Sequence, residues 1–157
     1  MVRIPPVPAA CPHCAGGCSD KIVQVLTNAK LTKQSSEPMV LEMLSKELRV
    51  YWMGVKVPIL KDRDFVIAEW NHRQQDGKHL NAFVSVQHPQ CGVQKKYVRA
   101  DILMGGWLID PAGHNSCDIT HITGVDPNGQ IPSFLKTATA AASADAVIAL
   151  KKLAEAC

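Results

Sequence analysis

Residues 64–88 read DFVIAEWNHRQQDGKHLNAFVSVQH and predict a β-hairpin. Two apolar and β-branched stretches, 65–72 and 79–88, are separated by a polar segment that contains Asp76-Gly77. Asp-Gly between two such stretches is a strong short-range signal for a hairpin turn. We therefore expect two adjacent antiparallel strands here.

Further strands flank this hairpin on both sides. Upstream, residues 49–57 (RVYWMGVKV) are β-branched and aromatic, which favours a strand. Residues 40–44 are ambiguous: local propensity favours a helix, whereas a turn at 45–47 would make them the first arm of a second hairpin. The strand is what the family resemblance described below implies. Downstream, a strand over 97–104 reaches Gly105-Gly106 and continues over 107–110, and another strand covers 116–125.

The periodicity changes after the turn at 126–129. Residues 133–157 contain no helix breaker, and apolar residues recur there at steps of three and four, which predicts one long C-terminal helix. The stripe is mostly alanine at its beginning and leucine at its end. Small side chains either serve helix propensity or leave space for a ligand. Strands followed by one long helix predict an α+β fold.

Composition and charge limit the classes of function. The chain has 157 residues, which suits one domain, and a formal net charge of +3, which is too weak to indicate nucleic-acid binding. No apolar run approaches a membrane span. The N-terminus lacks the continuous apolar segment of a signal peptide. We expect a cytoplasmic protein with an irregular Pro/Cys-rich leader at 1–20 and a folded domain at 21–157.

The six cysteines are interpreted as reduced thiols, because their spacing is not that of a small secreted disulfide scaffold. Cys11, Cys14 and Cys18 with His13 have a spacing compatible with zinc, but no second ligand pair follows. We therefore expect no metal and no other cofactor. His88 and Cys91 flank a proline in a turn and are interpreted as loop residues.

An ordered set of short motifs resembles the START (steroidogenic acute regulatory protein-related lipid transfer) family. The set consists of Arg63-Asp64-Phe65-Val66, Tyr97-Val98-Arg99-Ala100, Trp107-Leu108-Ile109, Val125-Asp126-Pro127 with Gly129, Ile131-Pro132 and Leu135. Compared with this family the chain looks N-terminally shortened, because the first helix and three strands are not recognisable in residues 1–38. The resemblance implies a helix-grip fold, in which a curved antiparallel sheet wraps around a long C-terminal helix.

The resemblance also implies a function, namely non-catalytic binding and transfer of one amphipathic lipid, a phospholipid or a sterol, in a cavity between sheet and helix. Segment 57–62 would be the lid of that cavity and would touch membranes transiently. Sterol-binding members place an acidic and a basic residue in the cavity; the matching positions here are Met53 and Glu69, so that pair is missing.

These implications select two sets of candidate site residues. The lipid-binding candidates are Arg99, Trp107, His121, Leu135, Ala138, Ala142 and Ala146. The candidates for the lid and membrane contact are Pro58, Ile59, Leu60 and Phe134. An inward-facing Arg99 requires a partner, either Asp101, Asp110 or an anionic head group, whereas Arg63 and Asp64 are interpreted as structural ion-pair formers.

Two other functions remain open at this point. Related helix-grip proteins include cyclases, which need an acid–base pair in the cavity. His121 with Asp110 or Asp118 is the only candidate set for that chemistry. A regulatory fragment that binds no ligand is the third hypothesis.

Overall fold

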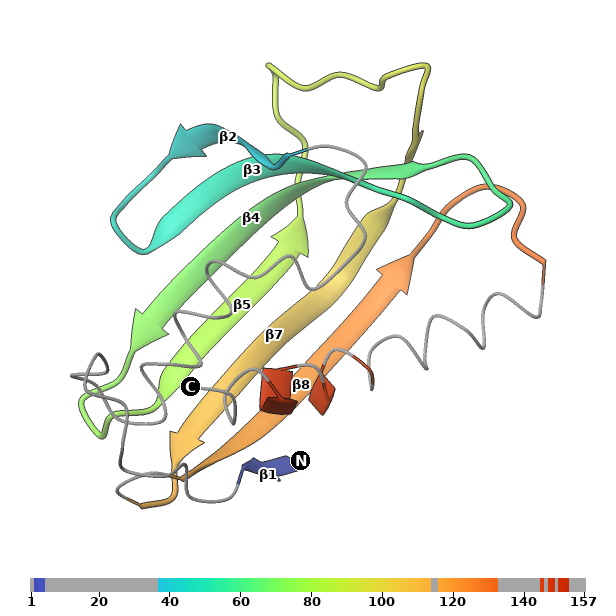
Figure 1. Ribbon diagram of the computed structural model, residues 1–157. Helices are drawn as coiled ribbons and strands as arrows, with labels where there is room; N and C mark the ends of the chain where they lie inside the picture. The colour runs from blue at the N-terminus through green and yellow to red at the C-terminus, as the bar shows by residue number, and fades with distance from the viewer. Residues whose placement is uncertain are drawn as a thin grey trace.

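The protein folds around one antiparallel sheet, seen in a computed structural model that describes residues 2–4, 37–113, 116–132, 145, 147, 148 and 150–152. The sheet order is β1-β8-β7-β5-β4-β3-β2, and the short β6 pairs in parallel with β4 (Figure 1). The strands are β1 (Val2–Ile4), β2 (Met39–Met43), β3 (Leu48–Val55), β4 (Arg63–Arg73), β5 (His79–Ser85), β6 (Val98–Arg99), β7 (Asp101–Pro111) and β8 (Cys117–Asp126).

The two predicted hairpins are both present. In the β4–β5 hairpin, Gly77 has a φ of +87°, which favours glycine, and Lys78 donates its amide to the Asp76 carboxylate at 3.1 Å. In the β2–β3 hairpin, the Ser45 hydroxyl accepts the amides of Glu47 and Leu48 at 3.1 and 3.0 Å. The antiparallel pairing of Met39–Met43 with β3 shows that this segment is a strand and not a helix.

The sheet has two faces, which the strand register separates. Because side chains alternate along a strand and cross-strand partners share a face, Ile67, Trp107, Ile109 and His121 lie on one face. The described C-terminal residues 147, 148 and 150–152 lie in front of this face, which we call the helix-side face (Figure 1). Leu150 is completely buried.

The other face carries a separate apolar cluster. Val50, Trp52 and Val66 pack there with Cys91 and Tyr97 from the segment between β5 and β6. The Trp52 and Tyr97 rings meet edge to face, with centroids 5.5 Å apart. The segment 86–97 therefore covers one end of this opposite face.

Most of the predicted C-terminal helix lies outside the described residues. Residues 145, 147, 148 and 150–152 are helical, in line with the expected α+β class, and the rest of 133–157 lies outside the described residues. The curved antiparallel sheet is confirmed, while the full helix-grip arrangement stays a prediction. Among the described residues, none forms a helix long and apolar enough to cross a bilayer.

Two expectations about the strands need correction. Residues 2–4 form β1 beside β8, although residues 1–20 were expected to be irregular. The predicted strand at 97–104 is split at Ala100, because Val98 and Arg99 pair with the start of β4 while β7 begins at Asp101 and pairs with β8. Ala100 is completely buried at this change of partner.

Candidate functional site

A polar cluster lies on the helix-side face of β3, β4 and β5. The guanidinium of Arg49 donates to the Glu69 carboxylate, with Nε to Oε2 at 2.5 Å. The Asn81 side-chain amide donates to Glu69 Oε1 at 2.9 Å and to Asn71 Oδ1 at 2.8 Å. The Arg49 and Glu69 side chains are 33% and 13% exposed, so Arg49 keeps part of its guanidinium accessible. Four polar side chains therefore converge on this face, next to apolar side chains of the same strands.

Tyr51 borders this cluster on the same face. The Arg49 guanidinium lies 5.3 Å from the centroid of the Tyr51 ring, a cation–π geometry. Burial raises the pKa of the Tyr51 phenol, and the nearby Glu69 carboxylate raises this pKa further. The phenol therefore stays neutral, and its hydroxyl can donate or accept a hydrogen bond.

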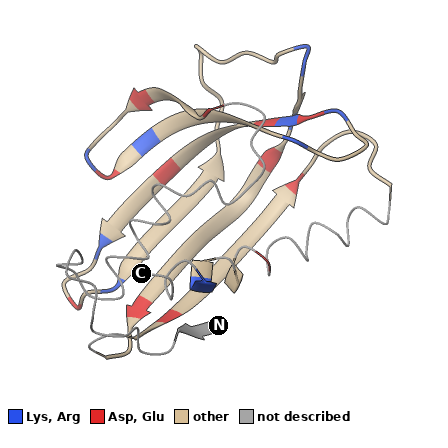
Figure 2. Ribbon diagram, viewed as in Figure 1, with Lys and Arg blue, Asp and Glu red and all other residues tan. Residues whose placement is uncertain are grey.

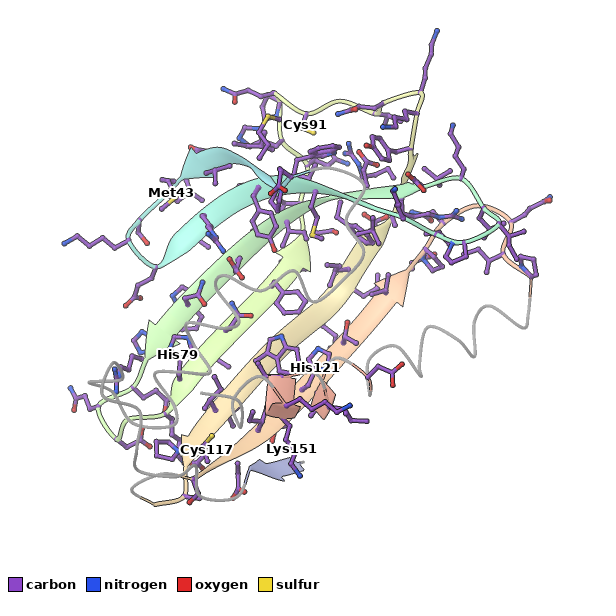
Figure 3. The ribbon with its side chains drawn as sticks, in the orientation of Figure 1. Met43, His79, Cys91, Cys117, His121 and Lys151 are labelled. Carbon is purple, nitrogen blue, oxygen red and sulfur yellow. The ribbon has the colours of Figure 1, made fainter. Side chains whose placement is uncertain are left out.

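An aromatic stack forms the second feature of the helix-side face. The rings of Trp107 and His121 lie parallel on neighbouring strands, with centroids 3.8 Å apart. Figure 3 shows His121 on the side of the sheet that faces the described helical residues. Burial lowers the pKa of His121, so the neutral imidazole is favoured. The predicted site residues Trp107 and His121 are thus brought together.

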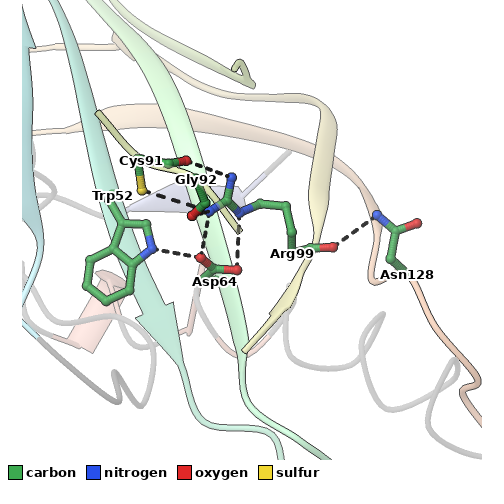
Figure 4. A network of polar contacts seen from close by, with 6 residues as sticks. All are labelled: Trp52, Asp64, Cys91, Gly92, Arg99 and Asn128. Atoms are coloured by element: carbon green, nitrogen blue, oxygen red, sulfur yellow. Dashed lines mark hydrogen bonds and ion pairs between the residues drawn. The ribbon is translucent and has the colours of Figure 1, made fainter. Parts of the chain in front are cut away.

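Arg99 is not part of this face. Its Nη2 and Nε atoms donate to the two oxygens of the Asp64 carboxylate at 2.9 and 3.1 Å, and Trp52 Nε1 donates to Oδ2 at 2.8 Å (Figure 4). Asp64 and Trp52 lie on the opposite face, so the prediction of an inward-facing Arg99 is wrong. Its predicted partners, Asp101 and Asp110, are wrong too, because the parallel pairing of β6 with β4 places Arg99 beside Asp64.

Arg63 also departs from its predicted role. Its guanidinium donates to backbone carbonyl oxygens, namely those of Lys61, Pro127 and Asn128, and not to a carboxylate. Asp64 does form an ion pair as predicted, with Arg99. Arg63 therefore ties the segment before β4 to the turn after β8.

The predicted lid segment forms the connection between β3 and β4. Ile59 is 89% exposed and has a φ of 70°, a conformation that β-branched residues rarely adopt. Pro58 is also exposed, and Leu60 is half-buried and donates its amide to Val57 O at 3.4 Å. An aliphatic side chain is therefore held at the tip of this tight connection, in water.

Several predicted residues lie outside the described part of the chain. These are Phe134, Leu135, Ala138, Ala142, Ala146 and the leader residues Cys11, His13, Cys14 and Cys18. Within the described residues, no group of three or more metal-binding side chains comes together. His88 lies in a turn and contacts Glu42 at 3.2 Å, while the Cys91 thiol is buried beside Arg99.

The candidate acid–base set for a cyclase is not assembled. Asp110 and Asp118 are cross-strand partners, and the strand alternation places both on the face opposite to His121. Asp110 instead pairs with Lys78 at 3.3 Å. Among the described residues, His121 therefore has an aromatic neighbour where a cyclase needs a carboxylate.

Comparison with known proteins identifies the family. The sequence matches the START domain over residues 21–155. The chain belongs to the START family. It is 34% identical over 99 residues to the START domain-containing protein 10 of mouse and of human. That match covers 62% of this chain and 33% of each relative, so it spans about a third of their length.

Solved structures show the same fold. The crystal structure of human STARD10 superposes with a TM-score of 0.81 at 23% identity, covering 97% of this chain and 60% of that one. Human StAR-related lipid transfer protein 5 gives a TM-score of 0.78 at 17% identity, covering 88% and 71%. The lipid transfer and protein localization domain of human StarD13 gives 0.73 at 19%, covering 97% and 73%.

Sequence reasoning missed Arg49 and therefore the charged pair. The family resemblance directs attention to Met53 and Glu69, whereas the register of β3 against β4 places Arg49 directly across from Glu69. The signal lies in the connection between β3 and β4, because its length and geometry fix this register. An ion pair between Arg49 and Glu69 therefore exists on the helix-side face, whereas the two positions matched to the sterol-type pair, Met53 and Glu69, still lack that pair.

Proposed function

We propose that this START domain binds one amphipathic lipid against its helix-side face and exchanges it at membranes without chemical conversion. The main support for this proposal is that a polar cluster, Arg49–Glu69–Asn81, and an apolar surface share one face of the sheet. Ligand sites for amphipathic molecules are mostly apolar, with a few placed polar groups that fix orientation.

The apolar part of the site would receive the hydrocarbon portion of the lipid. Its described members come from five neighbouring strands and alternate with side chains of the opposite face. They are Tyr51, Met53, Phe65, Ile67, Phe83, Trp107, Ile109 and Ile119. Removing apolar ligand surface from water at such a face contributes about 25 cal/mol per Å².

The polar cluster would receive the head group. Arg49 still has N–H groups beyond the two that face Glu69, and a guanidinium suits a phosphate or hydroxyl oxygen. Glu69 fixes Arg49, and Asn81 fixes Glu69, so the donors are oriented before the ligand arrives. This arrangement favours a lipid with an oxygen-rich polar end.

Native mass spectrometry of the purified protein tests the proposal directly. We expect one lipid per chain, and about tenfold weaker uptake of it in Glu69→Gln, because a hydrogen bond to a charged group contributes roughly 1.5–3 kcal/mol. Glu42→Gln is the matched control, since Glu42 pairs with His88 on the opposite face. A protein that carries no lipid and takes up neither phospholipid nor sterol from vesicles would refute lipid binding.

The lid role of segment 57–62 has its own test. Changing Ile59 and Leu60 together to Ser should slow transfer of a fluorescent lipid between vesicles and leave affinity for a bound lipid largely intact. Each aliphatic side chain that enters the bilayer contributes about 1.5–3 kcal/mol. An unchanged transfer rate would show that this segment is not where lipids enter.

A further inference from the structure

A second exposed segment lies beside the proposed lid and has the composition of a membrane contact. Residues 87–97, between β5 and β6, read QHPQCGVQKKY and contain no Asp or Glu. Val93 at its tip is 78% exposed, and Lys95 and Lys96 next to it are exposed as well. An aliphatic tip beside lysines suits a surface that is both apolar and negatively charged.

Contacts with the rest of the sheet hold this segment in place. The side chains of Cys91 and Tyr97 are buried in the apolar cluster of the opposite face. The Arg99 guanidinium binds the carbonyl oxygens of Cys91 and Gly92 at 3.4 and 3.2 Å. Tyr97 closes a turn by donating its amide to Gln94 O at 3.1 Å. Val93 therefore lies at the exposed tip of a segment that is anchored at both ends.

Hydrogen bonds join this segment to the proposed lid. The Val98 amide donates to Asp62 O at 2.9 Å, where segment 57–62 enters β4. Arg63 then links Lys61 to the turn after β8 through its bonds to Pro127 O and Asn128 O. Three connections therefore meet at one end of the sheet, and the exposed tips Ile59 and Val93 belong to two of them.

The charges at this end are unbalanced. Lys56, Lys61, Lys95 and Lys96 are all exposed, and none of them forms an ion pair with the described residues. Blue segments lie on both connections at this end in Figure 2. Of the nearby carboxylates, Asp64 is neutralised by Arg99. Asp62, Asp101 and Asp126 accept hydrogen bonds from uncharged amides and keep their charge, so the four lysines together with Arg63 still leave this end with a positive excess.

We propose that segment 87–97 is a second membrane-docking element, which acts with segment 57–62 to orient the START domain on an anionic phospholipid bilayer. Val93 enters the interface, and the four lysines bind the negative surface. The orientation follows from the fixed link between the two segments. This inference rests on the proposed function only in requiring that the protein visits membranes; it holds whether or not segment 57–62 is the entrance for lipid.

Vesicle co-sedimentation with the full chain tests this inference. The probes are vesicles of phosphatidylcholine alone and of phosphatidylcholine with phosphatidylserine. A triple variant carries Val93→Ser, Lys95→Gln and Lys96→Gln. The matched control carries Leu44→Ser and Lys46→Gln in the β2–β3 hairpin, where an exposed aliphatic residue and a lysine lie at the other end of β3.

We expect the triple variant to bind the anionic vesicles on the order of tenfold more weakly, because each lysine near such a surface contributes severalfold. The control variant should change little. The triple variant should lose less binding on neutral vesicles, where only Val93 contributes, than on anionic vesicles, and added salt should reduce this difference. Unchanged binding of the triple variant, or equal losses in both variants, would overturn the proposal. So would a loss that is as large on neutral vesicles, since it would remove the role of charge.

Two further measurements separate this inference from the proposed function. Lipid content by native mass spectrometry should be the same in the triple variant and the wild type, because segment 87–97 covers the face opposite to the polar cluster. The Ile59→Ser, Leu60→Ser variant is compared in the same sedimentation assay. A protein that holds no lipid but still needs Val93, Lys95 and Lys96 for anionic vesicles would refute lipid carriage and leave this inference standing.

Discussion

Two arginine–carboxylate pairs on opposite faces of the same sheet have different surroundings. Asp64 is completely buried, and its oxygens accept hydrogen bonds from Arg99 and from Trp52. Glu69 binds Arg49, which remains one-third exposed on the helix-side face. The hydrogen-bonding groups of the Asp64–Arg99 pair are used within the protein and anchor segment 87–97. In the Glu69–Arg49 pair, Arg49 keeps donors accessible to a ligand. The difference shows how one chemical pair gives a structural link on one face and a candidate binding group on the other.

The buried pair should be the more sensitive of the two. Asp64→Ala removes the partner of the Arg99 guanidinium and of the Trp52 N–H group, and breaking a buried pair in this way costs roughly 3–5 kcal/mol. Thermal unfolding should show a fall in Tm on the order of 10 °C. Chemical denaturation gives the free energy directly.

Asp64→Asn controls for shape, because its amide oxygen can still accept from Trp52, while the charge is lost and the second acceptor becomes an NH2 group that faces Arg99. Its loss of stability should lie between those of the wild type and Asp64→Ala. If Asp64→Ala unfolds at nearly the wild-type temperature, the Asp64 network is not the structural link that the comparison assigns to this face.

The adjacent glycines of β7 offer a second comparison of the two faces. A Cβ at Gly106 would lie 2.8 Å from the backbone oxygen of Asn81, whereas a Cβ at Gly105 would overlap the outer ring atoms of Phe83. A side-chain ring can rotate away, but a strand backbone cannot move without disturbing its pairing. Gly106→Ala should therefore cost about 1–3 kcal/mol. Gly105→Ala should cost less in stability, and denaturant unfolding of both variants measures the difference. Equal losses would show that the Phe83 ring is as firmly held as the backbone.

Much of the sheet was predictable, because its signals are local. Asp76-Gly77 marks one hairpin, and the stretch around Trp52 is β-branched and aromatic on both sides. The pairing of Arg99 with Asp64 was not predictable from spacing, because 35 residues separate them and the contact depends on a two-residue parallel strand. Arg49 was missed for a different reason, since its role depends on register and not on its neighbours in sequence.

The pH dependence of stability should report how well the helix-side face is shielded. Burial lowers the pKa of His121 in the folded state, while the unfolded state keeps a pKa near 6.5. Below about pH 6.5 the unfolded state therefore binds more protons at this residue, and stability falls as the pH falls. Thermal unfolding from pH 7.5 to 5 should show a shallower decline in His121→Gln than in the wild type. Identical slopes would mean that His121 is not shielded.

The smallest change in stability is expected from the accessible pair itself. Arg49→Met and Glu69→Gln, alone and combined, form a double-mutant cycle in which the coupling free energy measures the pair. Because Arg49 is one-third exposed, solvent screening limits that coupling to about 1 kcal/mol or less. Lipid uptake should respond more strongly than stability, since both single variants disturb the donors that would hold the head group. A coupling as large as that between Asp64 and Arg99, with unchanged lipid uptake, would make the second pair structural like the first. The division between the two faces would then have to be abandoned.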